Sequence, residues 1–340
     1  MKKIFFILLL IFPINILAIS TSARSAILMD TDSNRILYEK NINEVRSVAS
    51  ISKIMTAIVA IESGKMKKEV IVGDEIKSSY GSGIYLQQGE KLKLEDLVYG
   101  LMLRSGNDAA LAIAKYVGGS VDKFVEKMNK KAREIGMKNT TFNNPSGLDQ
   151  EKGNYSTAYD MAILTSYAMK NKEYRKITST KKYTLKTNKN VYNWINKNKL
   201  LKLYKYTTGG KTGFTEKARR TLVSTAKKDN MNLVVVTLND GNDWKDHENL
   251  FEYGFDNYKT MKILKRGNIN IYDDKYYKDY ILYVKNNFSY TVSKKEEEQI
   301  TIKYILNKVR NIKNNKKIGK VQIYFGDNKI HTESIYIKER

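Results

Sequence analysis

The sequence predicts a mixed fold of the α/β (α+β) class: a large domain with one antiparallel sheet flanked by helices, followed by a small β-rich domain. β-like runs lie at both ends of the large domain, over 25–40 and 220–240, with helical patterns between them. Strands from the two ends close most simply into one sheet. Beyond residue 262, β-rich sequence replaces the helical patterns. We therefore expect domains over 24–258 and 262–340.

The first 20 residues have the layout of a secretory signal peptide. Two lysines precede an apolar run from Ile4 to about Leu17, and small residues follow up to Ser20, where cleavage is expected. The run is short for a membrane span and Pro13 interrupts it, although an uncleaved N-terminal anchor is the alternative. The mature protein is therefore predicted to be exported and to work outside the cytoplasm.

The elements of the large domain follow in order along the chain. Residues 25–30 and 35–40 predict a hairpin, and 220–240 predicts two strands joined by a turn at Asp229-Asn230. Helices are predicted between them over 48–61, 94–117, 121–136 and 156–170. The second of these stretches is broken at Ser105-Gly106-Asn107, so we expect two helices there. The first is apolar almost all round, which is typical of a helix buried in a large core.

The composition limits the chemistry available to the chain. Cysteine is absent, which excludes disulfides, thiolate metal sites and a cysteine nucleophile. Only two histidines are present, His247 and His331, and neither belongs to an HExxH zinc motif. Proton transfer would therefore depend on lysine, carboxylates or hydroxyls, and we expect no metal or organic cofactor.

The net charge of +24 is distributed along the whole chain and forms no single dense block, so binding to nucleic acid is not predicted. A secreted basic protein would instead be attracted to anionic wall polymers or to a membrane surface. Most of the lysines fit a solvated surface.

A serine and a lysine stand three positions apart at the head of the buried helix, in "SVASISKIMT" (47–56). Ser50 and Lys53 would lie on one face of that helix, one turn apart. A lysine in a buried first turn costs free energy unless something uses it. Ser-x-x-Lys occurs three more times, but in sequence that is typical of surface: at Ser120/Lys123, Ser179/Lys182 and Ser224/Lys227.

Two further motifs follow along the chain. Ser105-Gly106-Asn107 is the only Ser-x-Asn tripeptide, and Lys211-Thr212-Gly213 is the only Lys-Thr-Gly. The motifs fall at a helix start, a break between helices and the lead-in to a strand, and such places can converge on one cleft. Any one of these short motifs, found alone, would more often be a coincidence than part of an active site. Together and in this order they are the signature of penicillin-interacting serine enzymes.

The residue types explain the chemistry of such a site. A serine hydroxyl is a poor nucleophile until a base takes its proton. Lys53 can be that base where burial and a second cation, Lys211, lower its pKa toward neutrality. The hydroxyl of Ser105 can pass a proton to a leaving amine, and the amide of Asn107 can hold both Lys53 and the substrate backbone.

The strand motif is expected to bind the substrate. Lys211 and Thr212 would face a substrate carboxylate, and Gly213 would let its strand come close to the substrate. We expect an oxyanion hole from the backbone N–H groups of Ser50 and Phe214.

With these motifs in place, the chain resembles the D-alanyl-D-alanine carboxypeptidases of the low-molecular-weight penicillin-binding protein class, peptidase family S11. The resemblance covers about residues 25–258 and includes "SAILMDTDSNRILYEKN", "LVYGLMLRSGNDAALAIA", "NPSGLD" and "GGKTGFT". It implies a serine β-lactamase/transpeptidase-like domain with a β-rich second domain.

The same resemblance implies the roles of the site residues. Ser50 would be the acyl-enzyme nucleophile and Lys53 the general base, Ser105 and Asn107 would complete the centre, and Lys211 would bind substrate. The implied reaction removes the terminal D-alanine from peptidoglycan stem pentapeptides, and β-lactam antibiotics would acylate the same serine.

Some features depart from the family pattern. Arg219-Arg220 follow "KTGFTEKA", where the family commonly has glycine. His247 lies about where many relatives carry an arginine near the terminal carboxylate of the substrate, which would make binding sensitive to pH. The segments "ARRTL" and "DWKDH" are similar to relatives used in sporulation. The C-terminal amphipathic anchor typical of the family is not evident.

Three other functions share parts of this sequence pattern. A β-lactamase would need a glutamate that activates water, usually in a Glu-x-x-Leu-Asn segment, and the sequence has none. A DD-endopeptidase acting on peptidoglycan cross-links stays open, because the difference lies in cleft shape. A non-catalytic β-lactam-sensing or wall-binding protein also stays open, although Ser50, Lys53 and Lys211 are all present.

Overall fold

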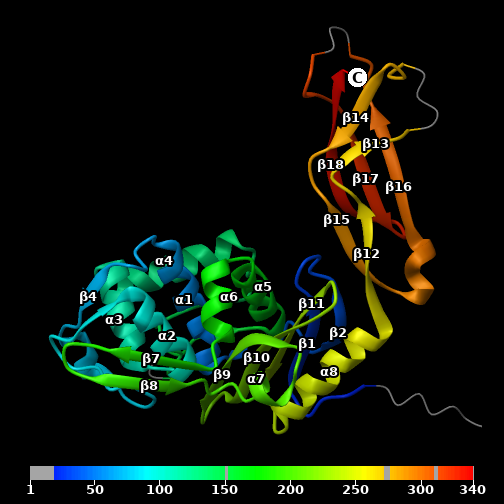
Figure 1. Cartoon of the computed structure of the whole chain (residues 1–340). Coiled ribbons are helices and arrows are strands. Elements are labelled where there is room, and N and C mark those ends of the chain that lie inside the picture. The colour runs from blue at the N-terminus through cyan, green and yellow to red at the C-terminus, as the bar shows by residue number, and fades with distance from the viewer. Residues whose placement is uncertain (1–18, 150–151, 272–275, 310–312, 340) are drawn as a thin grey trace, which may run out of the picture.

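The structure is a computed structural model, and it describes residues 19–149, 152–271, 276–309 and 313–339. The predicted signal peptide, up to residue 18, lies outside the described residues. Figure 1 shows an α/β domain and an elongated β domain, joined where α8 (Asp243–Asn257) runs into β12 (Tyr258–Leu264). Within the described ranges, no helix combines the length and the apolar character needed to cross a membrane.

Strands from both ends of the large domain form one five-stranded sheet in the order β2-β1-β11-β10-β9, and every neighbouring pair is antiparallel. β1 pairs with β11 along its full length, with Ser25 opposite Leu238. The prediction of one antiparallel sheet built from both ends is therefore confirmed. The strand bounds are Ser25–Asp30 (β1), Ile36–Lys40 (β2), Thr207–Thr215 (β9), Arg219–Lys228 (β10) and Met231–Leu238 (β11).

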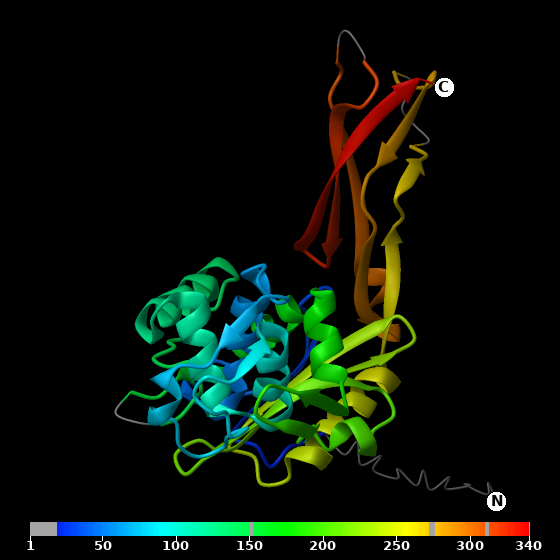
Figure 2. The same ribbon diagram turned by 60° about the vertical axis from the view of Figure 1, so that its left-hand side comes forward.

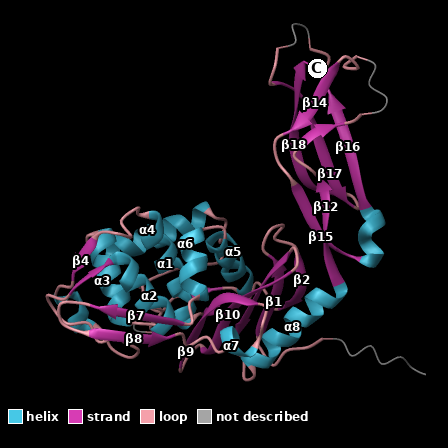
Figure 3. Ribbon diagram, in the orientation of Figure 1, coloured by secondary structure: helices cyan, strands magenta, loops and turns pink. Residues whose placement is uncertain are grey.

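Side chains alternate across this sheet and so divide the core of the domain into two clusters. Ile27 and Met29 of β1 belong to the larger cluster, which the α1–α6 helices complete. Leu28, between them, belongs to a second cluster with Leu250 and Phe251 of α8. The sheet is thus covered on both faces, and Figure 3 shows how nearly all the helices gather in this domain.

The helices on the larger cluster are α1 (Lys53–Glu62), α2 (Leu94–Arg104), α3 (Asn107–Gly118), α4 (Val121–Glu134), α5 (Ala158–Met169) and α6 (Lys172–Ser179). The helix predicted over 48–61 begins later than expected, because a 3-10 turn over Ala49–Ser52 precedes it. Ala49, the first residue of this turn, has a φ of 49°, so a regular α-helix cannot include it. The predicted break is confirmed: Ser105, with a φ of 66°, ends α2, and α3 begins at Asn107.

Short elements complete the domain around this core. They are a short helix, α7 (Leu200–Leu203), a 3-10 turn over Asp74–Ser78, and three strand pairs: β3 (Arg46–Ser47) with β6 (Tyr155–Ser156), β4 (Glu69–Ile71) with β5 (Lys91–Lys93), and β7 (Lys182–Lys186) with β8 (Val191–Ile195).

The second domain is β-rich, as predicted. One five-stranded sheet has the order β13-β14-β18-β17-β16, and β12 pairs with β15. Its small core includes Ile318, Val321 and Ile335. Figure 2 shows the domain as a long, narrow body that extends away from the α/β domain. The remaining elements are β13 (Gly267–Ile269), β14 (Tyr280–Val284), β15 (Phe288–Ser293), a 3-10 turn (Lys294–Gln299), β16 (Ile300–Leu306), β17 (Lys316–Phe325) and β18 (Asn328–Glu339).

The two domains touch at the β1–β2 hairpin. Asp30 Oδ2 accepts a hydrogen bond from Thr291 Oγ1 at 3.0 Å. Arg35 donates to the Thr291 carbonyl and forms an ion pair with Glu296 at 2.6 Å. The Arg35 guanidinium also lies 4.6 Å from the centre of the Phe325 ring. These contacts attach the base of the second domain to the first.

Candidate active site

Ser50 and Lys53 meet where the 3-10 turn passes into α1. Lys53 is fully buried at the first position of the helix. Its Nζ lies 2.9 Å from Ser50 Oγ and 2.7 Å from Asn107 Oδ1, and it also donates to the Ser146 carbonyl. Three polar contacts therefore fix the Lys53 amine, and one of them is with the hydroxyl of Ser50.

The surroundings of Lys53 favour its neutral form. Burial lowers the pKa of Lys53 well below its usual range, because the protein interior replaces the water that would solvate an ammonium group. The cations Lys211 and Lys197 lower the pKa further, and Asp108 opposes them. A neutral amine within hydrogen-bond distance of a hydroxyl has the geometry of a general base.

Ser105 and Lys211 form a second contact across the same site. Ser105 is held in the left-handed conformation at the end of α2 and is almost fully buried. Lys211, from β9, is also buried, and its Nζ donates to Ser105 Oγ at 3.1 Å and to the Thr212 carbonyl at 2.8 Å. Burial, and secondarily the charge of Lys197, lower the pKa of Lys211 to about 7.

Lys197 is a third amine in this site, and no motif in the sequence predicts it. It lies after β8 and its Nζ contacts Ser82 Oγ at 3.2 Å. Burial and the charge of Arg104 lower the pKa of Lys197 as well. Nothing in the surrounding lysine- and asparagine-rich connector distinguishes this lysine, so only its place in the fold identifies it.

The loop that carries Ser82 is fixed by the start of α3. Asn107 Nδ2 donates to the Tyr80 carbonyl at 2.6 Å. The buried carboxylate of Asp108 accepts from the backbone N–H groups of Ile84 and Leu86, at 3.0 and 3.1 Å. Asn107 thus connects this loop to Lys53 through one amide group.

β9 passes very close to the turn that carries Ser50. A Cβ atom added to Gly213 would overlap Thr221 Oγ1 and would lie 3.0 Å from Ser50 N and 3.1 Å from Ile51 N, closer than a side chain normally approaches. On the next strand, Thr221 Oγ1 donates to the Val48 carbonyl at 3.1 Å. The sheet therefore needs a glycine at position 213 to reach the serine.

A cleft of about 340 Å³ opens beside these residues. It is lined by Ser50, Ser82, Ser105, Lys197, Thr212, Gly213, Phe214, Arg220, Asp243 and Trp244. Phe214 is exposed at its edge. With Lys53, Asn107 and Lys211 behind this surface, the structure brings together eight of the nine predicted site residues.

His247 is the exception, and its predicted place beside the substrate carboxylate is corrected by the structure. The side chain is fully buried between α8 and the sheet, where Nδ1 contacts Ser224 Oγ and Nε2 lies 3.0 Å from Thr237 Oγ1. Burial lowers the pKa of His247 to about 3, so the ring stays neutral. His247 lies on the face of α8 that packs against the sheet. The position of a residue along the sequence does not show which face of its helix it occupies.

Arg220 supplies the cationic group at this edge of the cleft. It extends from β10, and its Nε donates to Asp243 Oδ2 at 3.1 Å, while Nη2 contacts the other carboxylate oxygen. Asp243 is buried, whereas the Arg220 side chain remains 43% exposed. Arg219-Arg220 depart from the family pattern, and the sequence alone does not predict that Arg220 lines the cleft.

Two family models match the chain. Residues 15–242 match peptidase family S11, D-alanyl-D-alanine carboxypeptidase, and residues 258–340 match the C-terminal domain of penicillin-binding protein 5.

Similar curated proteins cover the first of these regions. The D-alanyl-D-alanine carboxypeptidase DacF of Bacillus subtilis is 38% identical over 253 residues, which cover 72% of this chain and 65% of that protein. The D-alanyl-D-alanine carboxypeptidase DacC of Escherichia coli is 35% identical over 263 residues, covering 72% and 64%. The chain thus spans about 65% of the length of these relatives.

Solved structures extend the similarity to both domains. Penicillin-binding protein 5 from Haemophilus influenzae is similar with a TM-score of 0.78 and 29% identity, covering 94% of this chain and 97% of that one. The D-alanyl-D-alanine carboxypeptidase from Mycobacterium tuberculosis H37Rv matches with a TM-score of 0.67 and 30% identity, covering 70% and 92%. The fold, the motifs and the family models agree, and the chain belongs to the D-alanyl-D-alanine carboxypeptidase family, peptidase family S11.

Proposed function

We propose that the protein is a serine-type D-alanyl-D-alanine carboxypeptidase that removes the terminal D-alanine from peptidoglycan stem pentapeptides. The observation that carries this proposal is the contact of 2.9 Å between Lys53 Nζ and Ser50 Oγ in a buried site that lowers the pKa of the lysine. Membership of the family supports the substrate class.

In the proposed reaction, neutral Lys53 accepts the proton of Ser50 while the serine oxygen attacks the carbonyl carbon of the penultimate D-alanine. The two N–H bonds of the neutral amine remain for Asn107 Oδ1 and the Ser146 carbonyl. Collapse of the tetrahedral intermediate breaks the peptide bond. The leaving nitrogen takes up the proton through the Ser105 hydroxyl, and water then hydrolyses the ester. A β-lactam would acylate Ser50 in the same way.

The oxyanion and the substrate carboxylate need separate partners. The proposed oxyanion hole consists of the backbone N–H groups of Ser50 and Phe214, supported by the close approach of β9 at Gly213. Lys211 and Thr212 would hold the terminal carboxylate from the strand. Arg220 replaces His247 in this proposal as the cation at the edge of the cleft, since it lines the cleft and is half-exposed.

The test is mass spectrometry of a purified muropeptide pentapeptide incubated with the protein. Wild type should release one alanine, and Ser50→Ala should release none. The exposed Ser179/Lys182 pair has the same spacing, so the double variant Ser179→Ala/Lys182→Ala is a matched control that should keep full activity. Cleavage of cross-linked dimers alone would indicate an endopeptidase, and no cleavage of either substrate would leave sensing or binding as the function.

We further propose a catalytic domain over 24–258 and a β-rich domain over 262–340, supported by the passage from α8 to β12 at Asn257–Tyr258. Export through the segment 1–20 and action in the cell wall outside the cytoplasm are part of the same proposal. The segments "ARRTL" and "DWKDH" support a role in sporulation, which spore yield in a deletion strain would test.

A further inference from the structure

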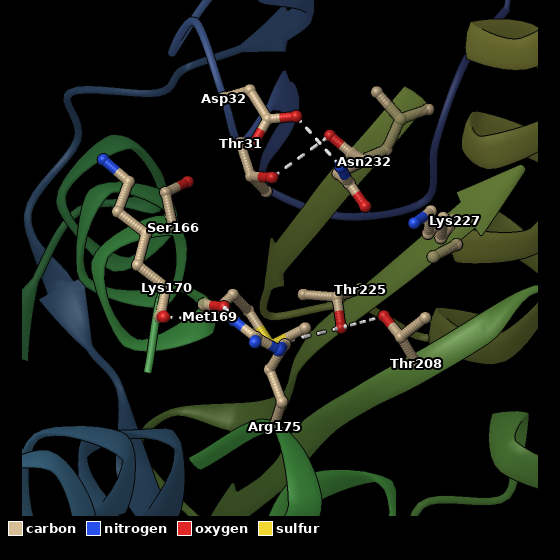
Figure 4. Close-up of a pocket in the computed structure, with 12 residues that line it drawn as sticks. Thr31, Asp32, Ser166, Met169, Lys170, Arg175, Thr208, Thr225, Lys227 and Asn232 are labelled. Atoms are coloured by element: carbon tan, nitrogen blue, oxygen red, sulfur yellow. Dashed lines mark hydrogen bonds between the residues drawn. The ribbon is translucent and has the colours of Figure 1, made fainter. Parts of the chain in front are cut away.

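A second cavity, of about 570 Å³, lies at the opposite end of the sheet from the cleft. Figure 4 shows its lining residues, which come from the end of α5, from α6, from strands β9, β10 and β11, and from the turn after β1. Thr208 of β9 lines this cavity, and Gly213 of the same strand lines the cleft. Five residues of extended strand separate them by roughly 17 Å. The mechanism proposed above uses no residue of this cavity.

Three cations and one carboxylate line the cavity. The cations are Lys170, Arg175 and Lys227. In the part of the chain that the structure describes, none of the three has a carboxylate within ion-pair distance. The carboxylate, Asp32, instead accepts from Asn232 Nδ2 at 2.9 Å. The cavity lining therefore carries an excess of positive charge, three cations against the one carboxylate of Asp32.

Arg175 is held in place by the end of α5. Its Nη1 donates to the Met169 carbonyl at 2.6 Å and to the Lys170 carbonyl at 3.0 Å. These bonds fix the guanidinium group at the cavity and satisfy carbonyls that the helix leaves free at its end. A guanidinium group has five N–H donors, so three remain, on Nε and Nη2. A fork of this kind matches two oxygens of a phosphate group.

Hydroxyl groups also line the cavity. Ser166, one turn before Lys170 on α5, is 2% exposed, and its Oγ has no hydrogen-bond partner. A buried hydroxyl without a partner costs free energy, and an oxyanion would accept its proton. Figure 4 also shows Thr208 and Thr225 on neighbouring strands, where Thr208 Oγ1 donates to Thr225 Oγ1 at 2.8 Å.

We propose that this cavity is an accessory binding site for a phosphate group, which Arg175 binds through its free fork, Lys170 and Lys227 neutralise, and Ser166 contacts through its unpartnered hydroxyl. The cavity is of the size that proteins use for small organic ligands. It therefore has room for a phosphate carried on a larger molecule, such as one unit of a phosphodiester polymer, as well as for free phosphate. The two sources share the same recognition chemistry.

The test is isothermal titration of the full-length protein with inorganic phosphate, glycerol 3-phosphate and a short glycerol phosphodiester oligomer, at ionic strength held constant with chloride. Wild type should bind with one saturable site. Arg175→Gln should weaken binding by at least about tenfold, because a hydrogen-bonded charge pair contributes on that scale. Lys182→Gln, at an exposed lysine on β7 remote from the cavity, is the matched control and should bind as wild type does.

The variant Ser166→Ala distinguishes between two roles of the Ser166 hydroxyl, contact with the ligand and support of the fold. Since its hydroxyl has no partner, the variant should unfold at the same temperature as wild type or higher without ligand, and should bind phosphate more weakly. Binding of the oligomer alone would identify a polymer phosphate, and binding of the small phosphates alone would identify a free one. Absence of saturable binding, or equal affinity in wild type and Arg175→Gln, would overturn the proposal.

Discussion

Lys211 Nζ lies 3.1 Å from Ser105 Oγ, although 106 positions separate the two residues in the chain. This contact joins the strand motif to the end of α2 and brings a second amine into the site of Lys53. Burial and then the charge of Lys211 lower the pKa of Lys53, whereas burial and the charge of Lys197 lower the pKa of Lys211. The strand motif therefore influences the ionisation of Lys53 in the helix motif.

The lowered pKa of Lys211 predicts how stability depends on pH. The folded protein loses the proton at about pH 7, whereas the unfolded chain keeps it up to the usual pKa of 10.5. Between these values the unfolded state binds more protons, so the free energy of unfolding rises with pH, by at most about 1.4 kcal/mol per pH unit for this group. Lys211→Met should reduce that slope in urea unfolding measured from pH 7 to 9. Lys182→Met should keep the wild-type slope, and an equal slope in both variants would contradict the buried titration.

Replacing Lys53 should abolish most of the acylation. Lys53→Met fills a similar volume but cannot accept the proton of Ser50, and general bases contribute about 10²- to 10⁴-fold. The rate of labelling by a fluorescent penicillin should fall in that range, while circular dichroism at 25 °C checks that the variant is folded. Labelling within threefold of wild type would exclude Lys53 as the base.

Gly213 should tolerate no side chain. The Cβ of Gly213→Ala would overlap first with Thr221 Oγ1 and would also press on the backbone of Ser50 and Ile51. Overpacking of this kind costs about 1–3 kcal/mol and would displace the nucleophile, so both the melting temperature and the acylation rate should fall. Gly241 is the matched control, because a Cβ there meets nothing within 4 Å. Similar losses in Gly213→Ala and Gly241→Ala would argue against a close approach of β9.

Arg220 and His247 should differ in their effects on substrate binding. Arg220→Gln removes the cation at the edge of the cleft and should raise KM for the pentapeptide about tenfold, with kcat changing less. His247→Gln should lower stability, because it disturbs buried contacts with Ser224 and Thr237. Since the ring is already neutral above about pH 3, His247→Gln should leave the pH profile of kcat/KM between 5 and 8 in place. A shift of that profile would indicate that His247 does contact the substrate.

Arg35 should control how firmly the two domains are attached. Arg35→Gln removes the ion pair with Glu296 and the hydrogen bond to the Thr291 carbonyl, worth about 1–3 kcal/mol together. Small-angle scattering should then report a broader distribution of particle dimensions, with penicillin acylation unchanged. Arg133→Gln, on the exposed face of α4, should scatter like wild type. A variant Arg35→Gln with wild-type scattering would mean that other contacts hold the domains.

Much of the site could be predicted from the sequence because its chemistry is local and uncommon. A serine and a lysine at the head of an apolar helix, a single Ser-x-Asn and a single Lys-Thr-Gly identified seven of the residues that the structure brings together, and the expected oxyanion hole added Phe214. The β-rich second domain and the sheet built from both chain ends followed from hydrophobic periodicity. The 3-10 turn before α1 was missed, because the positive φ of Ala49 has no signal in the residue type.

The sequence by itself thus determined which motifs carry the chemistry and which class of fold supports them. Only the tertiary structure decided which cations reach the cleft: Lys197 and Arg220 enter it, while His247 turns into the core. The physical reason is that a side chain's direction depends on strand register and helix rotation. Both are set by long-range packing, such as the pairing of Arg220 with Phe214 across β9 and β10.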